Sequence, residues 1–176
     1  GSLSKAVGRA VLAGAARARA HVGGHEPRAE ARASDAKYTA LYPHDDPAYS
    51  AHHGNITQMD DAFGRVMKKL DELKLSDNTL VIFTSDNGGP VNNGADNTPL
   101  RGAKGSTLEG GMRVCTIVWW PGKVPAGSQT SAITAHMDWL PTFASLAKAS
   151  APSDRKLDGI DISPVLLGKE GAKGHE

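Results

Sequence analysis

Cysteine is almost missing from this chain of 176 residues, which holds a single one, Cys115. One cysteine excludes a disulfide framework within the chain and a zinc site built on several cysteines. Long apolar runs are also missing, since no stretch approaches the roughly 20 residues that span a bilayer. A strong net charge is absent as well, because the formal charge is only +1. We therefore expect neither a nucleic-acid partner nor a membrane partner.

What is present is the composition of an ordinary globular domain, with 39% hydrophobic and 22% charged residues. Residues 1–36 differ from the rest, because they hold eleven alanines, five arginines and no aromatic residue. We treat 1–36 as an atypical leader and 37–176 as the domain. Two interpretations of the leader stay open, a weakly packed or disordered segment and a transit-peptide-like amphipathic helix.

A long helix is predicted after Pro47. Asp46 and Pro47 suit the N-cap and first position of a helix. Apolar residues then recur at spacings of three and four, which predicts one stripe that faces a core. The stripe consists of Ile56, Met59, Phe63, Val66, Leu70 and Leu73.

Two apolar runs read as strands, at 77–85 and at 113–122. The first, "DNTLVIFTS", shows no alternation, so we expect a strand buried on both faces and therefore parallel and central. A helix around Trp139 and Phe143 and a short apolar helix within "LDGIDISPVLLGKE" follow. This order predicts the α/β class, as a fragment of a three-layer α/β/α domain with a mostly parallel sheet.

The segment "TSDNGGPVNNGADNTPLRGAKGSTLEGG" directly follows the first predicted strand. Ligands gather at the carboxyl ends of parallel strands, where Asp86 and Asn87 stand. Their oxygens suit a hard cation such as Ca²⁺, although Asx residues beside glycine also make plain turns. Both interpretations stay open for this pair, and Asp96 and Asn97 raise the same choice.

Lys104 lies in the glycine-rich second half of that segment, where its ammonium could meet an anionic oxygen. A nucleotide loop is not expected, because the glycine spacing of the Walker pattern is absent. We assign Arg101, Glu109 and Arg113 to a structural ion-pair network that holds the loop.

Taken together, "NTLVIFTSDNG", "PLRGAKGSTLEGGMRV" and "TIVWWPGKVPAG" resemble the sulfatase family of the alkaline phosphatase superfamily, arylsulfatases included. The upstream helix "HGNITQMDDAFGRVMKKLDEL" and the downstream "LDGIDISPVLLG" resemble it in the same order. The resemblance runs from about Tyr38 to Glu170 and covers only the later part of a sulfatase catalytic domain.

The resemblance implies hydrolysis of sulfate esters with a formylglycine nucleophile and a Ca²⁺ ion held by four oxygen-bearing side chains. Carried onto this chain, Asp86 and Asn87 match half of the calcium site, and Lys104 matches the lysine that contacts the sulfate. It also implies a periplasmic or secreted location.

The chain departs from the family pattern in three places. Cys115 is followed by "TIVWW" rather than by the formylglycine motif, so we expect it to be a small buried strand residue. The other two calcium aspartates have no counterpart. Arg28 stands in the place of a sulfate-facing histidine, and His25 is retained as a nearby candidate for that role.

Three functional hypotheses follow. The first is a sulfuric ester hydrolase by lineage, with this chain as an incomplete and inactive fragment that acts on a sulfate ester only if completed. The second is a non-catalytic α/β module that associates with another chain, or with itself, through an open sheet edge. The third is a phosphonate or phosphate ester hydrolase of the same superfamily.

Overall fold

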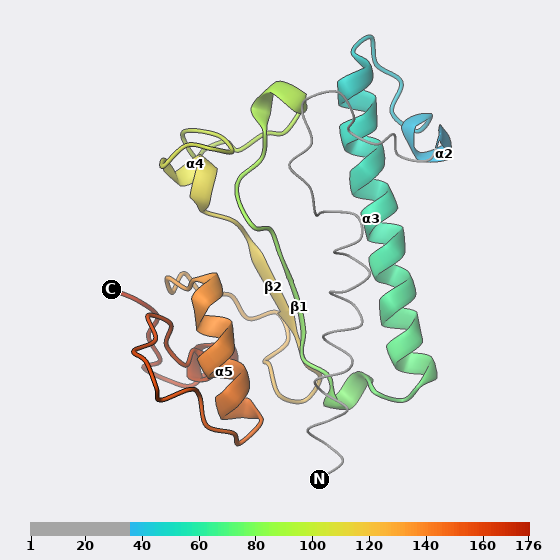
Figure 1. The fold of residues 1–176 in the computed structure, drawn as a ribbon. Coiled ribbons are helices and arrows are strands. Elements are labelled where there is room, and N and C mark those ends of the chain that lie inside the picture. The colour runs from blue at the N-terminus through green and yellow to red at the C-terminus, as the bar shows by residue number, and fades with distance from the viewer. Residues whose placement is uncertain (1–35) are drawn as a thin grey trace. The chain divides into compact units, whose positions relative to one another are not determined.

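The computed structural model describes residues 36–176, and these fall into two compact units. The helix unit holds residues 36–76 and 82–117, and the C-terminal unit holds residues 77–81 and 118–176. Figure 1 shows their helices and strands. The predictions for the leader, His25 and Arg28 fall on residues outside those described.

The helix unit begins with the short helix α2 (Ala36–Thr39) and the long helix α3 (Pro47–Glu72), which contact each other. Asp46 caps α3, because its carboxylate accepts a hydrogen bond of 2.9 Å from the Ala48 backbone N–H. Pro47 fills the first turn, where a missing N–H costs nothing. The predicted helix and its start are confirmed.

The apolar stripe of α3 is only partly covered. Leu70 is buried, and Phe63 packs edge-on against Phe83, with 5.5 Å between ring centroids. Met59 and Val66, in contrast, remain 47% and 46% exposed. The expectation of a stripe that faces a core along its whole length is therefore wrong, because a two-stranded sheet offers too little surface to cover it.

The two predicted strands are β1 (Val81–Thr84) and β2 (Thr116–Trp119), which pair in a two-stranded sheet (Figure 1). The hydroxyls of Thr84 and Thr116 lie 2.8 Å apart, and the Gly88 N–H donates to the Gly111 carbonyl at 3.0 Å. Later residues of the first segment therefore lie beside earlier residues of the second, which makes β1 and β2 antiparallel.

This pairing corrects the expectation that β1 is parallel and fully buried, since all four of its residues are half-buried. A continuous apolar run indicates cover on both faces, but it does not encode the direction of the neighbouring strand.

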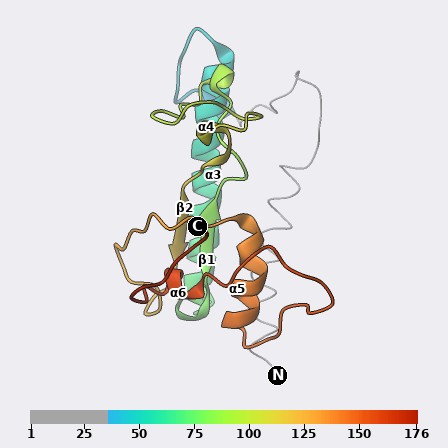
Figure 2. The same cartoon turned by 90° about the vertical axis from the view of Figure 1, so that its left-hand side faces the viewer.

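Short elements complete both units. The helix unit also contains η2 (Val91–Asn93) and α4 (Glu109–Met112). The C-terminal unit contains α5 (Trp139–Leu146), which confirms the predicted helix, and α6 (Ser163–Leu166), which contacts α5 (Figure 2). The remaining single turns are η1 (Ser76–Asn78) and η3 (His136–Asp138). Within residues 36–176, no helix is both long enough and apolar enough to cross a membrane.

The N-cap of α3 can be tested by Asp46→Ala. Loss of the hydrogen bond to the Ala48 N–H should lower the free energy of unfolding by about 1 kcal/mol. Urea unfolding followed by circular dichroism at 222 nm measures the change. Asp45→Ala is the matched control, because it removes the same charge one position earlier. Equal losses in the two variants would contradict a capping role for Asp46.

Candidate functional site

Asp86 and Asn87 directly follow β1 and form the first part of the candidate site. Asp86 is exposed and Asn87 is half-buried. The Ser85 hydroxyl donates to the Asn87 carbonyl at 2.8 Å, which fixes the backbone of this turn. Within the described residues, neither side chain has a hydrogen-bond partner, so their oxygens remain available to a ligand.

The next residue, Gly88, brings a second segment against this turn. Its N–H donates to Gly111 at 3.0 Å, and a Cβ built on Gly88 would overlap the carbonyl oxygen of Gly110. Only glycine permits so close an approach of two backbones. The carboxyl end of β1 therefore lies directly against the start of α4.

Lys104 is joined to the same turn through its backbone. Its N–H donates to the carbonyl of Gly89 at 3.2 Å, and its side chain is exposed. Gly89 is two positions beyond Asn87. The structure thus brings the backbones of all three predicted residues into one loop assembly of the helix unit, with the side chains of Asp86 and Lys104 in solvent.

The neighbouring Asx residues, Asp96 and Asn97, are engaged with backbone groups rather than left as free ligands. The Asp96 carboxylate accepts a hydrogen bond of 2.8 Å from the Thr98 N–H, and this bond lowers the pKa of Asp96. The Asn97 amide is engaged with the backbone of Gly89 and Gly102. The structure therefore favours the turn for Asp96, and it commits the Asn97 amide to two backbone segments rather than leaving it free for a ligand.

The expected ion-pair network around Lys104 is reduced to one weak pair. Arg113 and Glu109 lie 3.8 Å apart, with both side chains about two-thirds exposed. An exposed pair of this kind contributes little. Among the described residues, Arg101 has no ion-pair partner. Backbone hydrogen bonds, rather than charges, hold this loop.

Calcium fits the described residues only in part. Asp86 and Asn87 offer two adjacent side-chain oxygen ligands, and Ca²⁺ takes six to eight. No group of three His, Cys, Asp or Glu side chains within residues 36–176 is arranged to hold a metal ion. The described residues therefore supply a partial donor set and no complete calcium shell.

Two histidines on α3 are packed rather than solvated, which the sequence did not reveal. The ring of His53 lies between Tyr49 and Tyr42, with centroid distances of 4.1 Å and 5.5 Å. Burial lowers the pKa of His52, and the nearby His53 lowers it further. Both side chains are half-buried, and tyrosines before and within α3 pack against His53.

Cys115 also differs from its predicted environment. The residue immediately precedes β2, and its thiol is free and exposed. The next two residues, Thr116 and Ile117, point to opposite faces of β2 and are exposed as well, so neither face is covered at this end of the strand.

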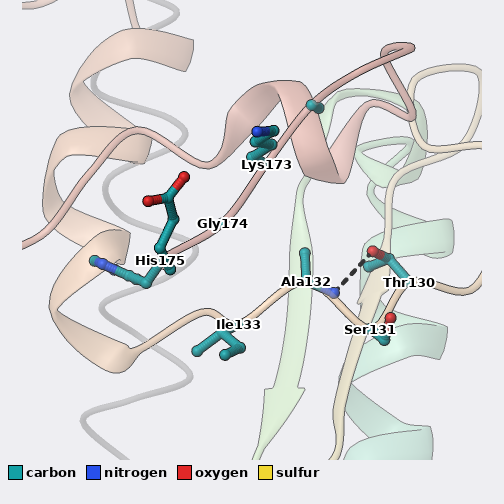
Figure 3. Close-up of a pocket in the computed structure, with 9 residues that line it drawn as sticks. Thr130, Ser131, Ala132, Ile133, Lys173, Gly174 and His175 are labelled. Atoms are coloured by element: carbon teal, nitrogen blue, oxygen red, sulfur yellow. Dashed lines mark hydrogen bonds between the residues drawn. The ribbon is translucent and has the colours of Figure 1, made fainter.

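A shallow pocket of about 440 Å³ lies in the C-terminal unit (Figure 3). Residues 130–133 form one wall and residues 172–176 form the other, with Lys173 and His175 as its basic side chains. His175 is held by Asp138, so its ring serves the unit's internal structure. None of the predicted site residues lines this pocket.

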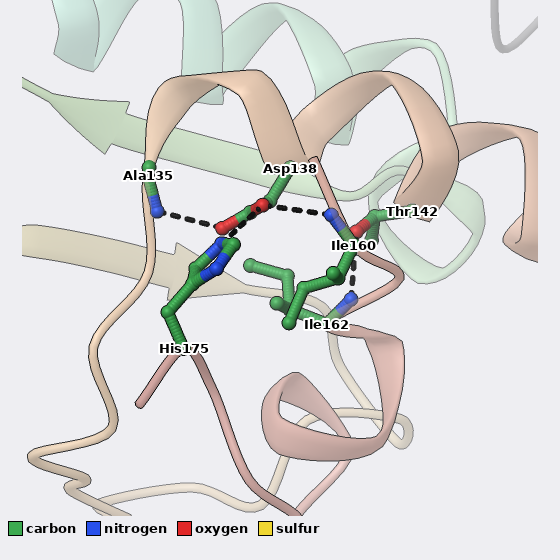
Figure 4. Close-up of polar contacts among 6 residues, drawn as sticks. All are labelled: Ala135, Asp138, Thr142, Ile160, Ile162 and His175. Carbon is green, nitrogen blue, oxygen red and sulfur yellow. Dashed lines mark hydrogen bonds and ion pairs between the residues drawn. The ribbon is translucent and has the colours of Figure 1, made fainter. Parts of the chain in front are cut away.

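Asp138 is the most connected side chain of the C-terminal unit (Figure 4). It is fully buried and accepts from the N–H groups of Ala135 at 2.7 Å and Ile160 at 2.9 Å. His175 Nε2 lies 2.7 Å from the same carboxylate. Burial acts to raise the pKa of Asp138, but the hydrogen bonds from Ala135, Ile160 and His175 outweigh burial and lower it.

Comparisons with known proteins agree on one family. The family model described as Sulfatase matches residues 20–149. N-acetylgalactosamine-6-sulfatase from Canis lupus familiaris is 42% identical over 117 residues, which is 64% of this chain and 22% of that protein. Steryl-sulfatase from Homo sapiens is 38% identical over 151 residues, covering 79% of this chain and 26% of that protein. The chain thus spans about a quarter of the length of these curated relatives.

Solved structures give the same answer for the fold. Ps i-CgsB in complex with k-i-k-neocarrahexaose matches with a TM-score of 0.76 and 31% identity, over 94% of this chain and 38% of that chain. The PsFucS1 sulfatase from Pseudoalteromonas sp. matches with a TM-score of 0.68 and 30% identity, over 85% and 30% respectively. The predicted α/β class, as a piece of an alkaline phosphatase-like domain, is confirmed.

The Asp138 network makes the C-terminal unit sensitive to acid. Because the folded pKa of Asp138 lies below its ordinary value of 3.8, its contribution is complete above pH 3.8 and is lost as pH falls through the folded pKa. Asp138→Asn should therefore cost about 1 to 3 kcal/mol at pH 7 and progressively less below pH 4. Urea unfolding followed by tryptophan fluorescence across this pH range measures both effects.

The exposed Asp158 provides the control, since Asp158→Asn removes a similar charge in the same unit. A cost of Asp138→Asn that stays constant between pH 7 and pH 3 would show that the charge of Asp138 does not carry the stabilisation.

Proposed function

The chain belongs to the sulfatase family, and we propose that it is the later part of the catalytic domain of a sulfuric ester hydrolase. One observation supports this most directly. Among residues 36–176, the side-chain oxygens of Asp86 and Asn87 have no hydrogen-bond partner, and the Lys104 N–H donates to the carbonyl of Gly89, two residues after Asn87. A carboxylate, an amide and an ammonium on one loop assembly are suited to a cation together with an anionic group.

The proposed roles follow from the chemistry of the three side chains. Lys104 carries a compact positive charge with three N–H donors, so it would bind and neutralise an oxygen of the sulfate group. Asp86 and Asn87 would supply two side-chain oxygens to a calcium ion whose other ligands lie outside residues 36–176. When bound, calcium would supply positive charge that polarises the sulfate ester.

The nucleophile would also have to come from outside this sequence. No Cys or Ser in the chain is followed by Pro or Ala two positions on and Arg four positions on, as a formylglycine precursor requires. Without a nucleophile, binding and electrostatics alone remain. We therefore propose that residues 1–176 by themselves do not turn over sulfate esters.

We propose a sulfate ester as the substrate class, because the sulfate is what the names of the relatives share. N-acetylgalactosamine-6-sulfatase and steryl-sulfatase are named for different alcohols. Asp86, Asn87 and Lys104 would face the common sulfate rather than the variable alcohol.

A second candidate function, association with another chain, is supported by the exposed strand pair. Within the described residues each strand has only one partner, and Ile117 on β2 is 61% exposed. Exposed strand edges with apolar side chains favour pairing with a further strand. We propose self-association through this sheet as the default state of residues 1–176 in solution.

The hydrolase proposal can be tested with two proteins, residues 1–176 and the same chain with the in-frame residues encoded upstream of Gly1. The extended protein should hydrolyse 4-nitrophenyl sulfate, and a calcium chelator should abolish the activity. Lys104→Ala should lower kcat by about 100-fold, as loss of one charge-stabilising donor typically does. Asp86→Ala should raise the calcium concentration needed for activity. Lys123→Ala, which removes an exposed lysine elsewhere, is the control.

Turnover by residues 1–176 alone would overturn the inactive-fragment proposal. An extended protein that hydrolyses 4-nitrophenyl phosphate and not the sulfate would favour the phosphate ester hydrolase of the same superfamily.

Self-association predicts a concentration-dependent elution volume for residues 1–176 in size-exclusion chromatography with light scattering. Ile117→Lys should shift the population toward monomer, because a charge on the exposed face opposes strand pairing. Ile133→Lys, at an exposed isoleucine outside the strands, should leave the elution volume unchanged. A monomer at every concentration would refute the proposal.

A further inference from the structure

Asn97 makes three hydrogen bonds to two separate segments of the glycine-rich loop. Its Oδ1 accepts from the Gly89 N–H at 2.9 Å, and its Nδ2 donates to the Gly89 carbonyl at 2.9 Å. The same Nδ2 donates to the Gly102 carbonyl at 3.1 Å. The side chain is half-buried, and both of its N–H donors are used.

The partners of Asn97 connect the two halves of the proposed site. Gly89 lies two residues after Asn87, and Gly102 lies two residues before Lys104. The Gly89 carbonyl also accepts the N–H of Lys104 at 3.2 Å. One side-chain amide thus ties the turn that carries Asp86 and Asn87 to the segment that carries Lys104.

We propose that Asn97 is a positioning residue that sets the place of Lys104 relative to Asp86 and Asn87. The role of Lys104 in this inference rests on the proposed function. The linkage between the two segments rests on the hydrogen bonds of Asn97 alone. Asn97 touches neither the sulfate nor the cation in this proposal. It acts through the backbone of Gly89 and Gly102.

The chemistry of the linkage requires an amide. Two of the three bonds are donated to carbonyl oxygens and one is accepted from an N–H, and only Asn and Gln side chains offer an acceptor oxygen and two N–H donors at one planar group. Aspartate has the same shape but cannot donate, and its charge would face two carbonyl oxygens. Alanine would leave the Gly89 and Gly102 groups without these partners.

A plain turn does not explain this geometry. An Asx turn bonds the backbone two residues on, as Asp96 does with Thr98 at 2.8 Å. The partners of Asn97 lie eight residues before it and five residues after it. Asp96 therefore shapes the local turn, and Asn97 links segments that are distant in sequence.

Amide hydrogen exchange by NMR on residues 1–176 tests the linkage without reference to function. Asn97→Ala should speed exchange at Lys104 and Gly89 by at least about tenfold, because loss of the linkage frees the Gly89 peptide. Asn97→Asp keeps an acceptor for the Gly89 N–H but loses both donated bonds, so it should speed exchange at Lys104. Asn92→Asp adds the same charge to the same loop at an exposed position, and should leave both rates unchanged. The amides of α3 report on the fold of the helix unit.

Titration with sodium sulfate, followed at the backbone amide resonances of positions 87–89 and 104, tests the positioning. Wild type and Asn92→Asp should respond to sulfate, Lys104→Ala should lose the response, and Asn97→Ala should weaken apparent binding by at least about tenfold. The uncharged Asn97→Ala separates a loss of positioning from simple repulsion of the anion.

The outcomes separate the two proposals. No sulfate response in wild type would overturn the role of Lys104 in the proposed function. A wild-type response that Asn97→Ala leaves as strong as before would overturn the inference about Asn97 alone. Unchanged exchange at Lys104 would also overturn it, as would loss of protection throughout α3, which would assign Asn97 to the stability of the whole helix unit.

Discussion

The candidate site depends on one steric constraint, the close approach of two glycine backbones. Gly88 lies against Gly110 and Gly111, and a side chain on Gly88 would overlap the Gly110 carbonyl. A Cβ on Gly110 would in turn overlap the carbonyl of Gly102. Three segments of the loop therefore share a space that holds only backbone atoms. This contact sets where β1 ends and where the chain returns toward β2.

The residues proposed for the site lie at the margins of this contact, one or two positions from the glycines. Asn87 directly precedes Gly88, and Lys104 follows Gly102 by two residues. Backbone atoms have few degrees of freedom, so hydrogen bonds between them position side chains more firmly than exposed ion pairs do. The loop can thus hold its geometry while the side chains of Asp86 and Lys104 point to solvent. In this arrangement the Asn97 side chain joins two separate segments of the backbone framework.

Local features of the fold were predictable from the sequence, and non-local ones were not. The start of α3 at Asp46 and Pro47 follows from capping chemistry within four residues, and the structure confirms it. The direction of β1 depends on which strand pairs with it, and no pattern within 77–85 encodes that partner. The packing of His53 against Tyr42 and Tyr49 was missed for the same reason, since it depends on how the chain before α3 folds back.

The site residues were predicted from the resemblance to the sulfatase family more than from the chemistry of the residues themselves. Asp86 and Asn87 alone suited a cation and a turn equally, and Lys104 looked like any exposed lysine in a flexible loop. Their assignment as site residues remains a prediction. Asn97 could not be singled out, because an Asx residue near glycine and proline is ordinary turn chemistry. Its distinguishing feature is that it forms hydrogen bonds with Gly89, eight residues before it, and with Gly102, five residues after it. Only the folded structure reveals these bonds.

Polar contacts have an unusual share in the interior of the described chain. Among residues 36–176, three apolar side chains are buried, Tyr38, Leu70 and Ile162, against four polar ones, Ser50, Asp138, Thr142 and Ser163. Two of these polar residues order the C-terminal unit, because Asp138 binds the Ile160 N–H and Thr142 binds the Ile162 N–H. Buried polar groups stabilise a structure only when all their bonds are made, and then they specify one arrangement.

The same principle operates in the helix unit, where Asn97 saturates the Gly89 peptide. Each unit is therefore organised by directional bonds around one side chain, rather than by the amount of apolar surface it buries. Directional bonds fix geometry without requiring a large core, whereas the half-exposed stripe of α3 still requires apolar cover. It follows that the geometry of the loop and the coverage of the helix are separate properties of this chain. A partner that covers α3 would add stability, while the arrangement of Asp86, Asn87 and Lys104 would already be in place.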